Sequence, residues 1–253
     1  MQTPTTRQEW EKVAQDYQLH WQFPNCLGSL DGKHIQIKQP PGTGSFFYNY
    51  KGTFSIILLA LVDARYRFLF ADVGTNGRIS DGGVWSKCAL RHQIESGQIE
   101  LPPPAKLPNS EKVLPHVILG DNAFPLTENL MKPFPHRQQT PSQRVFSYRL
   151  SRARRTVENA FGILANRFRV FLSPIGLSPE KVVKIVLCCL ALHNFLIDEC
   201  KSYSILSSED TPRQEEPMEG GHALVRLRGQ TIHAKNVRDQ FCNYFNNEGA
   251  VNW

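Results

Sequence analysis

The sequence lacks any apolar run long enough to cross a membrane. Its longest apolar stretch, Ile185 to Leu192, covers eight residues, whereas a spanning helix needs about 20. The N-terminus, MQTPTTRQEWEK, has no apolar stretch behind a basic start, so a secretory signal is not expected. These two absences predict a protein with no membrane partner.

Cysteine spacing of the kind that marks a disulfide framework or a zinc site is also missing. The six cysteines stand at positions 26, 88, 188, 189, 200 and 242, and none of them forms a CxxC pair. We therefore expect reduced, mostly buried thiols in an intracellular protein. Aromatic residues are not scarce, since the chain has 15 Phe, 7 Tyr and 4 Trp. This content excludes a mostly disordered chain.

Acidic residues are almost absent from one segment. Between Lys132 and Arg169 there are nine Lys or Arg and a single acid, Glu158, which gives the segment a net charge of +8 in a chain that totals +6. A local cluster of this density indicates binding to a polyanion, most simply a nucleic acid. The alternative is a solvated basic face with no ligand.

The hydrophobic pattern predicts a mixed α/β domain. Apolar alternation and one buried run favour three strands in a meander, and a shorter apolar run favours a later strand. Helical spacing and cap residues favour helices around them. The predicted strands cover 26–37, 54–62, 66–73 and 117–119, and the predicted helices cover 7–19, 81–94, 151–169 and 178–199, with a further helix around 237–245. This order describes one sheet with helices on both faces.

Three acids lack an ordinary structural explanation. Asp31 lies in a strand-like segment, where aspartate is disfavoured, although an Asp-Gly turn is the alternative. Asp121 ends the short apolar strand, and ligand-binding residues gather at such strand ends, although it also fits a helix cap. Glu158 is the lone acid of the basic segment, and a surface pair with Arg154 four residues earlier is its alternative.

These carboxylates would suit a metal site if the sheet brings them together. Carboxylates held close repel each other unless a cation neutralises them. Two divalent ions can clamp the attacking and leaving oxygens of a phosphodiester in line. Oxygen ligands suit Mg²⁺ or Mn²⁺, and the nearby arginines suit a nucleic acid.

Several ordered motifs resemble the PIF/Harbinger transposase family, and more narrowly the Harbinger transposase-derived nucleases. The motifs are CLGSLDGKHI, FYNYKGTFSIILLALVDA, VILGDNAF, RRTVENAFGILANRFRVF and CCLALHNF, which together cover roughly 26–199. The resemblance implies an RNase H-like core with a two-Asp, one-Glu (DDE) triad. The triad falls on Asp31, Asp121 and Glu158, which are 90 and 37 residues apart.

The resemblance implies a metal-dependent endonuclease that hydrolyses DNA. Asp31 would bridge two Mg²⁺ or Mn²⁺ ions, and Asp121 and Glu158 would each complete one. We expect four arginines to hold DNA phosphates: Arg152, Arg154, Arg155 and Arg167. The alternatives are a catalytically silent, domesticated transposase that binds DNA or acts as an adaptor, and a phosphohydrolase for small phosphoesters, against which the long basic segment argues.

The predicted organisation has four parts. A helical segment at 1–25 precedes an RNase H-like nuclease domain at 26–200, and an acidic flexible loop at 201–221 leads to a helical tail at 222–253 that packs on the core. Family members usually carry a DNA-binding region ahead of the core, and here only about 25 residues precede it. The expected partners are therefore DNA and a separate Myb-like DNA-binding protein, with a homo-oligomer left open. The expected location is the nucleus, with the cytoplasm as a second site.

Overall fold

The computed structural model describes residues 3–200 and 232–251. The acidic segment predicted at 201–221, and the first part of the predicted tail, lie outside the described residues. In the described part, the tail contributes helix α7 (Ile232–Asn246), which packs against the long helix α4 (Pro141–Arg167). No helix in this part is long and apolar enough to cross a membrane.

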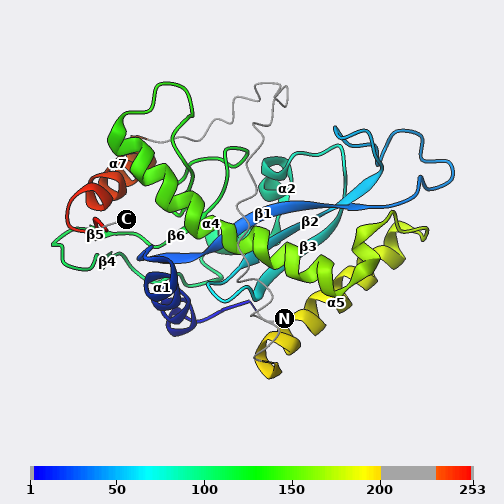
Figure 1. The fold of residues 1–253 in the computed structure, drawn as a ribbon, viewed down its shortest axis with the longest axis horizontal. Coiled ribbons are helices and arrows are strands. Elements are labelled where there is room, and N and C mark those ends of the chain that lie inside the picture. Colours follow the sequence, from blue (N-terminus) through cyan, green and yellow to red (C-terminus); the bar gives the residue numbers. More distant parts are fainter. Residues whose placement is uncertain (1–2, 201–231, 252–253) are drawn as a thin grey trace.

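A five-stranded sheet lies at the centre of the fold (Figure 1), with the strand order β3-β2-β1-β6-β7. The predicted meander is confirmed: β1 (Cys26–Gln36), β2 (Ser55–Val62) and β3 (Phe68–Asn76) pair antiparallel in sequence order. Every residue of β2 is buried, because the strand lies inside the sheet and is covered on both faces. The short strands β6 (Val117–Leu119) and β7 (Leu130–Met131) extend the sheet in parallel with β1.

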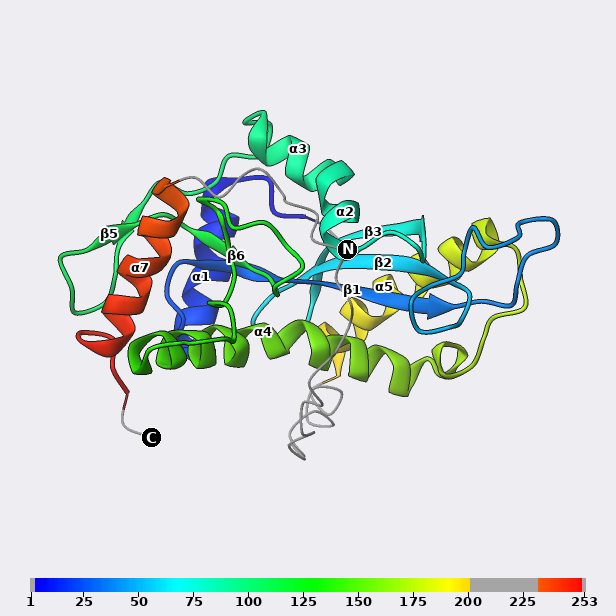
Figure 2. The same cartoon turned by 90° about the horizontal axis from the view of Figure 1, so that it is seen from above.

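Helices cover both faces of this sheet. Figure 2 shows α4 and α5 on one face and α2 and α3 on the other. Besides α4, the helices that cover the faces are α2 (Asp81–Lys87), α3 (Ala89–Glu95) and α5 (Pro179–Glu199). The other elements are α1 (Arg7–Trp21), β4 (Ala105–Lys106), β5 (Val113–Leu114) and the 3-10 turn η1 (Arg169–Leu172). The predicted class, an α/β RNase H-like fold with a mixed sheet and helices on both faces, is confirmed.

Two predicted helices have different bounds in the structure. The helix expected over 81–94 is two helices, because Cys88 adopts an extended conformation between them and is fully buried. Helix α4 begins at Pro141 rather than at Ser151. Thr140 caps it with a capping box, in which its side chain and that of Gln143 each bond the other's backbone N–H.

Helix α4 connects the two hydrophobic cores of the domain. Its first half, with Phe146 and Leu150, packs in the core that contains α1 and α7. Its second half, with Phe161 and Leu164, packs in the core under α5. Ala153 belongs to the first core and Val157 to the second, so the two cores meet between these residues. At this point the polar face of α4 lies beside the middle of the sheet.

Candidate active site

The site begins where strand β6 ends beside β1. Their parallel pairing runs from Cys26 to Ser29, which lies opposite Leu119. Carried two residues further, this register sets Asp31 opposite Asp121, and neighbouring strands lie about 4.8 Å apart. Strand β1 continues to Gln36, while β6 has already stopped. The edge of β1 therefore opens at Asp31, and the two aspartates lie at this opening.

Local contacts fix the loop that carries Asp121. The Asp121 Oδ1 accepts a hydrogen bond from the Ala123 N–H at 2.8 Å. A side chain at Gly120 would have its Cβ 2.9 Å from the ring of Phe124, so the tight turn requires glycine there. The Lys132 Nζ donates to the Phe124 carbonyl at 2.8 Å. These bonds hold the loop in one conformation next to the strand end.

Glu158 joins the site through a shared arginine. The Arg154 Nη2 lies 2.8 Å from the Glu158 Oε1, and its Nη1 lies 3.6 Å from the Asp31 Oδ2. The Asp31 side chain is 17% exposed and that of Glu158 is 41% exposed. The pair of Arg154 and Glu158 was considered from the sequence as a surface feature, but here the same guanidinium also contacts a nearly buried carboxylate. The structure thus gathers all three predicted acids at one edge of the sheet.

A fourth carboxylate, that of Asp81 at the start of α2, lies at the same place. The cap of α2 is Ser80, whose Oγ accepts a hydrogen bond from the Gly83 N–H at 3.3 Å. The carboxylate of Asp81 instead lies against Gly32, where an added Cβ would come 2.0 Å from its Oδ1. Gly32, the glycine after Asp31, was the sequence signal for this contact, because a glycine in a strand marks a place where another group approaches the strand closely.

Burial and mutual repulsion oppose ionisation at this site. Burial raises the pKa of Asp31 to about 7, with Asp121 and Asp81 raising it further and Arg154 opposing them. Burial likewise raises the pKa of Asp81 to about 6, with Asp121 adding to the rise and Lys51 opposing it. A cation placed among these groups would favour their charged forms.

The donors suit a hard divalent cation, although the described side chains do not form a ligand cage as they stand. Carboxylate oxygens are the ligands that Mg²⁺ and Mn²⁺ prefer. Among the residues that the structure describes, no three His, Cys, Asp or Glu side chains are arranged to hold an ion. The guanidinium of Arg154 bridges two of the acids and supplies the positive charge there. Asp31 and Glu158 thus share one positive charge in this arrangement.

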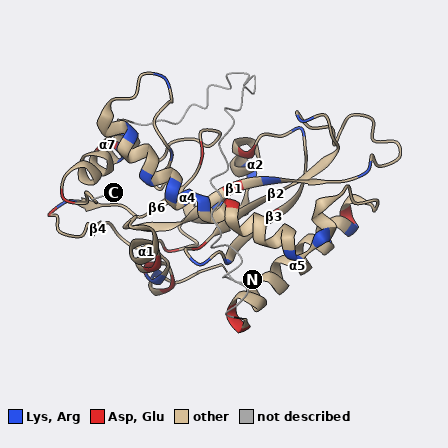
Figure 3. Ribbon diagram, in the orientation of Figure 1, with Lys and Arg blue, Asp and Glu red and all other residues tan. Residues whose placement is uncertain are grey.

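The four arginines expected to hold DNA differ in their surroundings. Arg154 lies in the carboxylate site. Arg152 donates to the Gln22 Oε1 at 2.7 Å. Arg155 and Arg167 are exposed. Figure 3 shows several Lys and Arg along α4.

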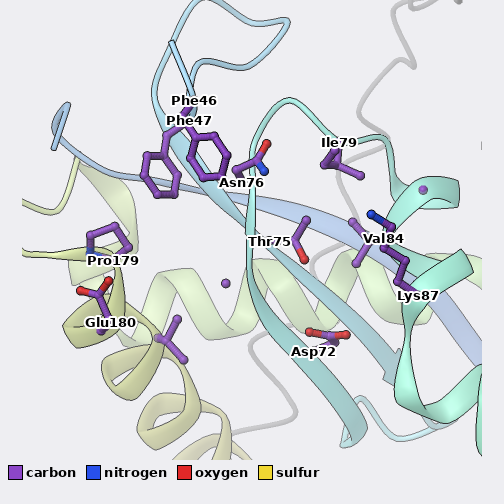
Figure 4. A pocket seen from close by; sticks show the side chains of 13 residues that line it. Phe46, Phe47, Asp72, Thr75, Asn76, Ile79, Val84, Lys87, Pro179 and Glu180 are labelled. Carbon is purple, nitrogen blue, oxygen red and sulfur yellow. The ribbon is translucent and has the colours of Figure 1, made fainter. Parts of the chain in front are cut away.

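The pocket in Figure 4 is separate from this site. It has a volume of about 480 Å³ and lies between the β3 edge, α2 and the start of α5. Phe46, Phe47, Asp72, Lys87 and Glu180 are among its lining residues. None of the four clustered carboxylates lines it.

Sequence comparison agrees with this arrangement. Residues 30–194, more than half of the chain, match the family described as DDE superfamily endonuclease. "Protein ALP1-like" of Arabidopsis thaliana is 28% identical over 207 residues, which are 80% of this chain and 48% of the relative. "Putative nuclease HARBI1" is 28% identical over 221 residues in Homo sapiens and 29% identical over 221 residues in Bos taurus, each covering 86% of this chain and 58% of the relative.

The chain spans about half the length of these curated relatives. No solved structure matches it. The Harbinger resemblance that the motifs predicted is confirmed by these relatives. The fold and the family match lead to the same conclusion: this chain belongs to the DDE superfamily endonucleases.

Proposed function

We propose that this protein is a transposase-derived, metal-dependent nuclease that hydrolyses DNA phosphodiesters with Asp31, Asp121 and Glu158. The observation that carries the proposal is the placement of these three acids on a strand, a strand end and a helix: Arg154 pairs with both Asp31 and Glu158, and the strand pairing sets Asp121 beside Asp31. A surface ion pair alone would not place a nearly buried aspartate of β1 against the same guanidinium.

Each residue has a distinct part in this proposal. Asp31 lies between the other two and would be shared by two Mg²⁺ or Mn²⁺ ions, while Asp121 and Glu158 would each complete one. When bound, two such ions supply the Lewis acidity for an in-line displacement at phosphorus. Arg154 balances the charge of Asp31 and Glu158, and the exposed Arg155 and Arg167 hold DNA phosphates on the outer face of α4.

The bridging position of Arg154 also favours the alternative, a catalytically silent, domesticated transposase that binds DNA or acts as an adaptor. In that case Arg154 would be a permanent replacement for the metal. The two candidates differ in one respect that can be measured, since only the nuclease needs Glu158 to be a carboxylate.

The test is single-turnover cleavage of duplex DNA in Mn²⁺ by the wild type and by Glu158→Gln. Glutamine keeps the size and helix propensity of glutamate but removes the charge that holds a cation. We expect Glu158→Gln to abolish cleavage while its thermal melt stays close to that of the wild type, because a surface pair contributes under about 1 kcal/mol.

The matched control is Glu95→Gln. Glu95 pairs with Arg91 at 2.7 Å and with the same four-residue spacing on a helix, but far from the carboxylates in the sequence. It should cleave like the wild type. A well-folded Glu158→Gln that cleaves at the wild-type rate would remove Glu158 from the triad, and a wild type without any cleavage would support the silent alternative.

The proposal extends to the setting of the reaction. We place the protein in the nucleus with DNA as its substrate and with a separate Myb-like protein as the source of sequence-specific docking. Co-purification of such a partner would test the docking, and light scattering on the purified chain would test for a homo-oligomer.

A further inference from the structure

The connection between β1 and β2 carries exposed aromatic rings that the proposed chemistry does not use. This β1–β2 arm, residues 37–54, projects from the sheet as the long blue loop of Figures 1 and 2. Its exposed large hydrophobic side chains are all aromatic, namely Phe46, Tyr48 and Tyr50, and Tyr50 is 69% exposed. It contains the sequence FYNYKGTF, part of a motif that the catalytic proposal leaves without a role.

Hydrogen bonds hold the tip of the arm in a defined shape. The side chain of Asn49 is buried, with the residue only 3% exposed. Its Oδ1 accepts from the backbone N–H groups of Lys51 and Thr53 at 3.0 and 3.2 Å, and its Nδ2 donates to the Ser55 Oγ at 2.8 Å. The Asn49 N–H also donates to the Thr53 carbonyl at 2.8 Å. A hydrogen-bonded turn therefore holds Tyr50 in an exposed position.

The charge of the arm is of one sign. Between Gly32 and Val62 the sequence has three lysines, Lys33, Lys38 and Lys51, and no Asp or Glu. The Lys51 Nζ lies 5.5 Å from the centre of the Tyr50 ring, and the His34 ring lies 5.5 Å from the same ring at a steep angle. An exposed ring bordered by the Lys51 cation and the His34 ring suits an anionic ligand with flat, stackable groups.

The arm begins beside the carboxylate site. His34 follows Asp31 by three residues on β1, which is about 10 Å at the rise of a strand. Lys51 lies near enough to Asp81 to oppose the rise in its pKa that burial and Asp121 cause. The His34 ring lies beside the Tyr50 ring, so His34 links the arm to the strand that carries Asp31.

We propose that the β1–β2 arm binds an unpaired stretch of the DNA strand being cut, with bases stacked on Tyr50 and Tyr48 and with Lys51 on a phosphate. The inference rests on the proposed function for the identity of the polymer as DNA. Stacking requires a base outside the duplex, so the arm would favour substrates that are single-stranded or opened next to the cleaved bond.

The test measures binding without metal, so that it is independent of cleavage. Fluorescence anisotropy in EDTA would compare a labelled single strand of about 20 nucleotides, longer than the site of one stacking groove, with its duplex and with the same strand carrying central abasic positions. The proteins would be the full chain as wild type, Tyr50→Leu and Tyr50→Phe. The control is Phe195→Leu, which removes an exposed ring from α5.

We expect Tyr50→Leu to bind the single strand about tenfold more weakly, as the loss of one stacked base predicts. Tyr50→Phe keeps the ring and should stay within about twofold of the wild type, as should Phe195→Leu. The wild type should bind the abasic strand at least as weakly as Tyr50→Leu binds the intact one, because abasic positions remove the stacking on both Tyr50 and Tyr48. Lys51→Gln should lower the slope of log affinity against log salt by about 0.7, the value for one phosphate on a single strand.

The proposal is overturned if Tyr50→Leu binds the single strand as the wild type does, or if the abasic and intact strands bind the wild type equally. Thermal melts establish folding, and Tyr48→Leu, with the same expected direction, is the second variant should Tyr50→Leu unfold. The two proposals fail separately, since a silent site would leave these binding differences intact, and an arm that does not stack would leave Mn²⁺-dependent cleavage intact.

Discussion

Asp31, on β1, and Asp63, directly after β2, are both largely buried aspartates, and they differ in what surrounds them. Asp63 follows β2, and its Oδ1 accepts from the N–H groups of Arg65 and Arg67 at 2.9 and 2.8 Å. Asp31 accepts one backbone bond, from Gly32 at 2.9 Å, and faces two other carboxylates and Arg154.

Burial raises the pKa of both groups, to about 6 for Asp63 and about 7 for Asp31. A raised pKa therefore does not separate a structural carboxylate from a functional one. The partners do: two backbone N–H groups donate to Asp63 and close a turn, whereas Asp31 lies close to Asp121 and Asp81 and shares Arg154 with Glu158. Unbalanced negative charge at a strand end is the feature that indicates cation binding.

The largest expected difference between the two aspartates is in cleavage. In single-turnover cleavage of duplex DNA in Mn²⁺, Asp31→Asn should lose about a thousandfold in rate, since the loss of a shared ligand removes several kcal/mol of transition-state stabilisation. Asp63→Asn keeps an acceptor oxygen for both N–H groups and should cleave at the wild-type rate. Equal losses in the two variants would show that folding, and not the site, determines the result.

The second difference is in stability, and it has opposite signs at the two positions. Without metal at pH 8, Asp31→Ala should stabilise the protein by about 2 kcal/mol, because it removes a buried charge. Asp63→Ala should destabilise it by about 2 kcal/mol, because it leaves two partly buried backbone N–H groups of the turn without a partner. Urea unfolding in EDTA measures both.

The pH dependence of stability distinguishes charge from packing as the cause of the stability change in Asp31→Ala. The ordinary pKa of this group is 3.8 and its folded value is about 7, so between these values the folded chain holds a proton that the unfolded chain has lost. The stability contributed by Asp31 therefore falls as pH rises through this window. The advantage of Asp31→Ala should be full above pH 7 and vanish near pH 4. A pH-independent advantage would point to packing instead of charge.

Local sequence signals predicted the sheet and three members of the acidic cluster. Apolar alternation fixed the meander, and the end of the apolar run placed Asp121. Asp81 was not predicted because its position depends on a contact across the sheet with Gly32. Gly32 marks a close approach to the strand, but nothing in the local sequence identifies Asp81 as the residue that approaches it.

The basic segment, 132–169, is a second place where local sequence signals did not predict the surroundings of a charged side chain. Its charge was counted as one surface, but Arg149 is 2% exposed and donates to the carbonyls of Gln22 and Gly249. Its guanidinium also lies 4.6 Å from the centre of the Phe245 ring. Helix periodicity would have placed Arg149 beside Phe146 and Leu150 on the buried face, had α4 been predicted from its true start at Pro141.

The smallest expected effect concerns Arg154, the side-chain cation that pairs with Asp31 and Glu158. If Arg154 substitutes for a metal ion at Asp31 and Glu158, its removal should make Mn²⁺ bind more tightly, because the ion no longer competes with a guanidinium. We expect Arg154→Gln to bind Mn²⁺ about fivefold more tightly in calorimetry, which corresponds to about 1 kcal/mol. Its neighbour Arg155 is exposed, and Arg155→Gln should leave Mn²⁺ affinity unchanged while weakening DNA binding. Weaker Mn²⁺ binding by Arg154→Gln would mean that the arginine positions Glu158 for the ion instead of replacing it, because glutamine cannot hold that carboxylate at 2.8 Å.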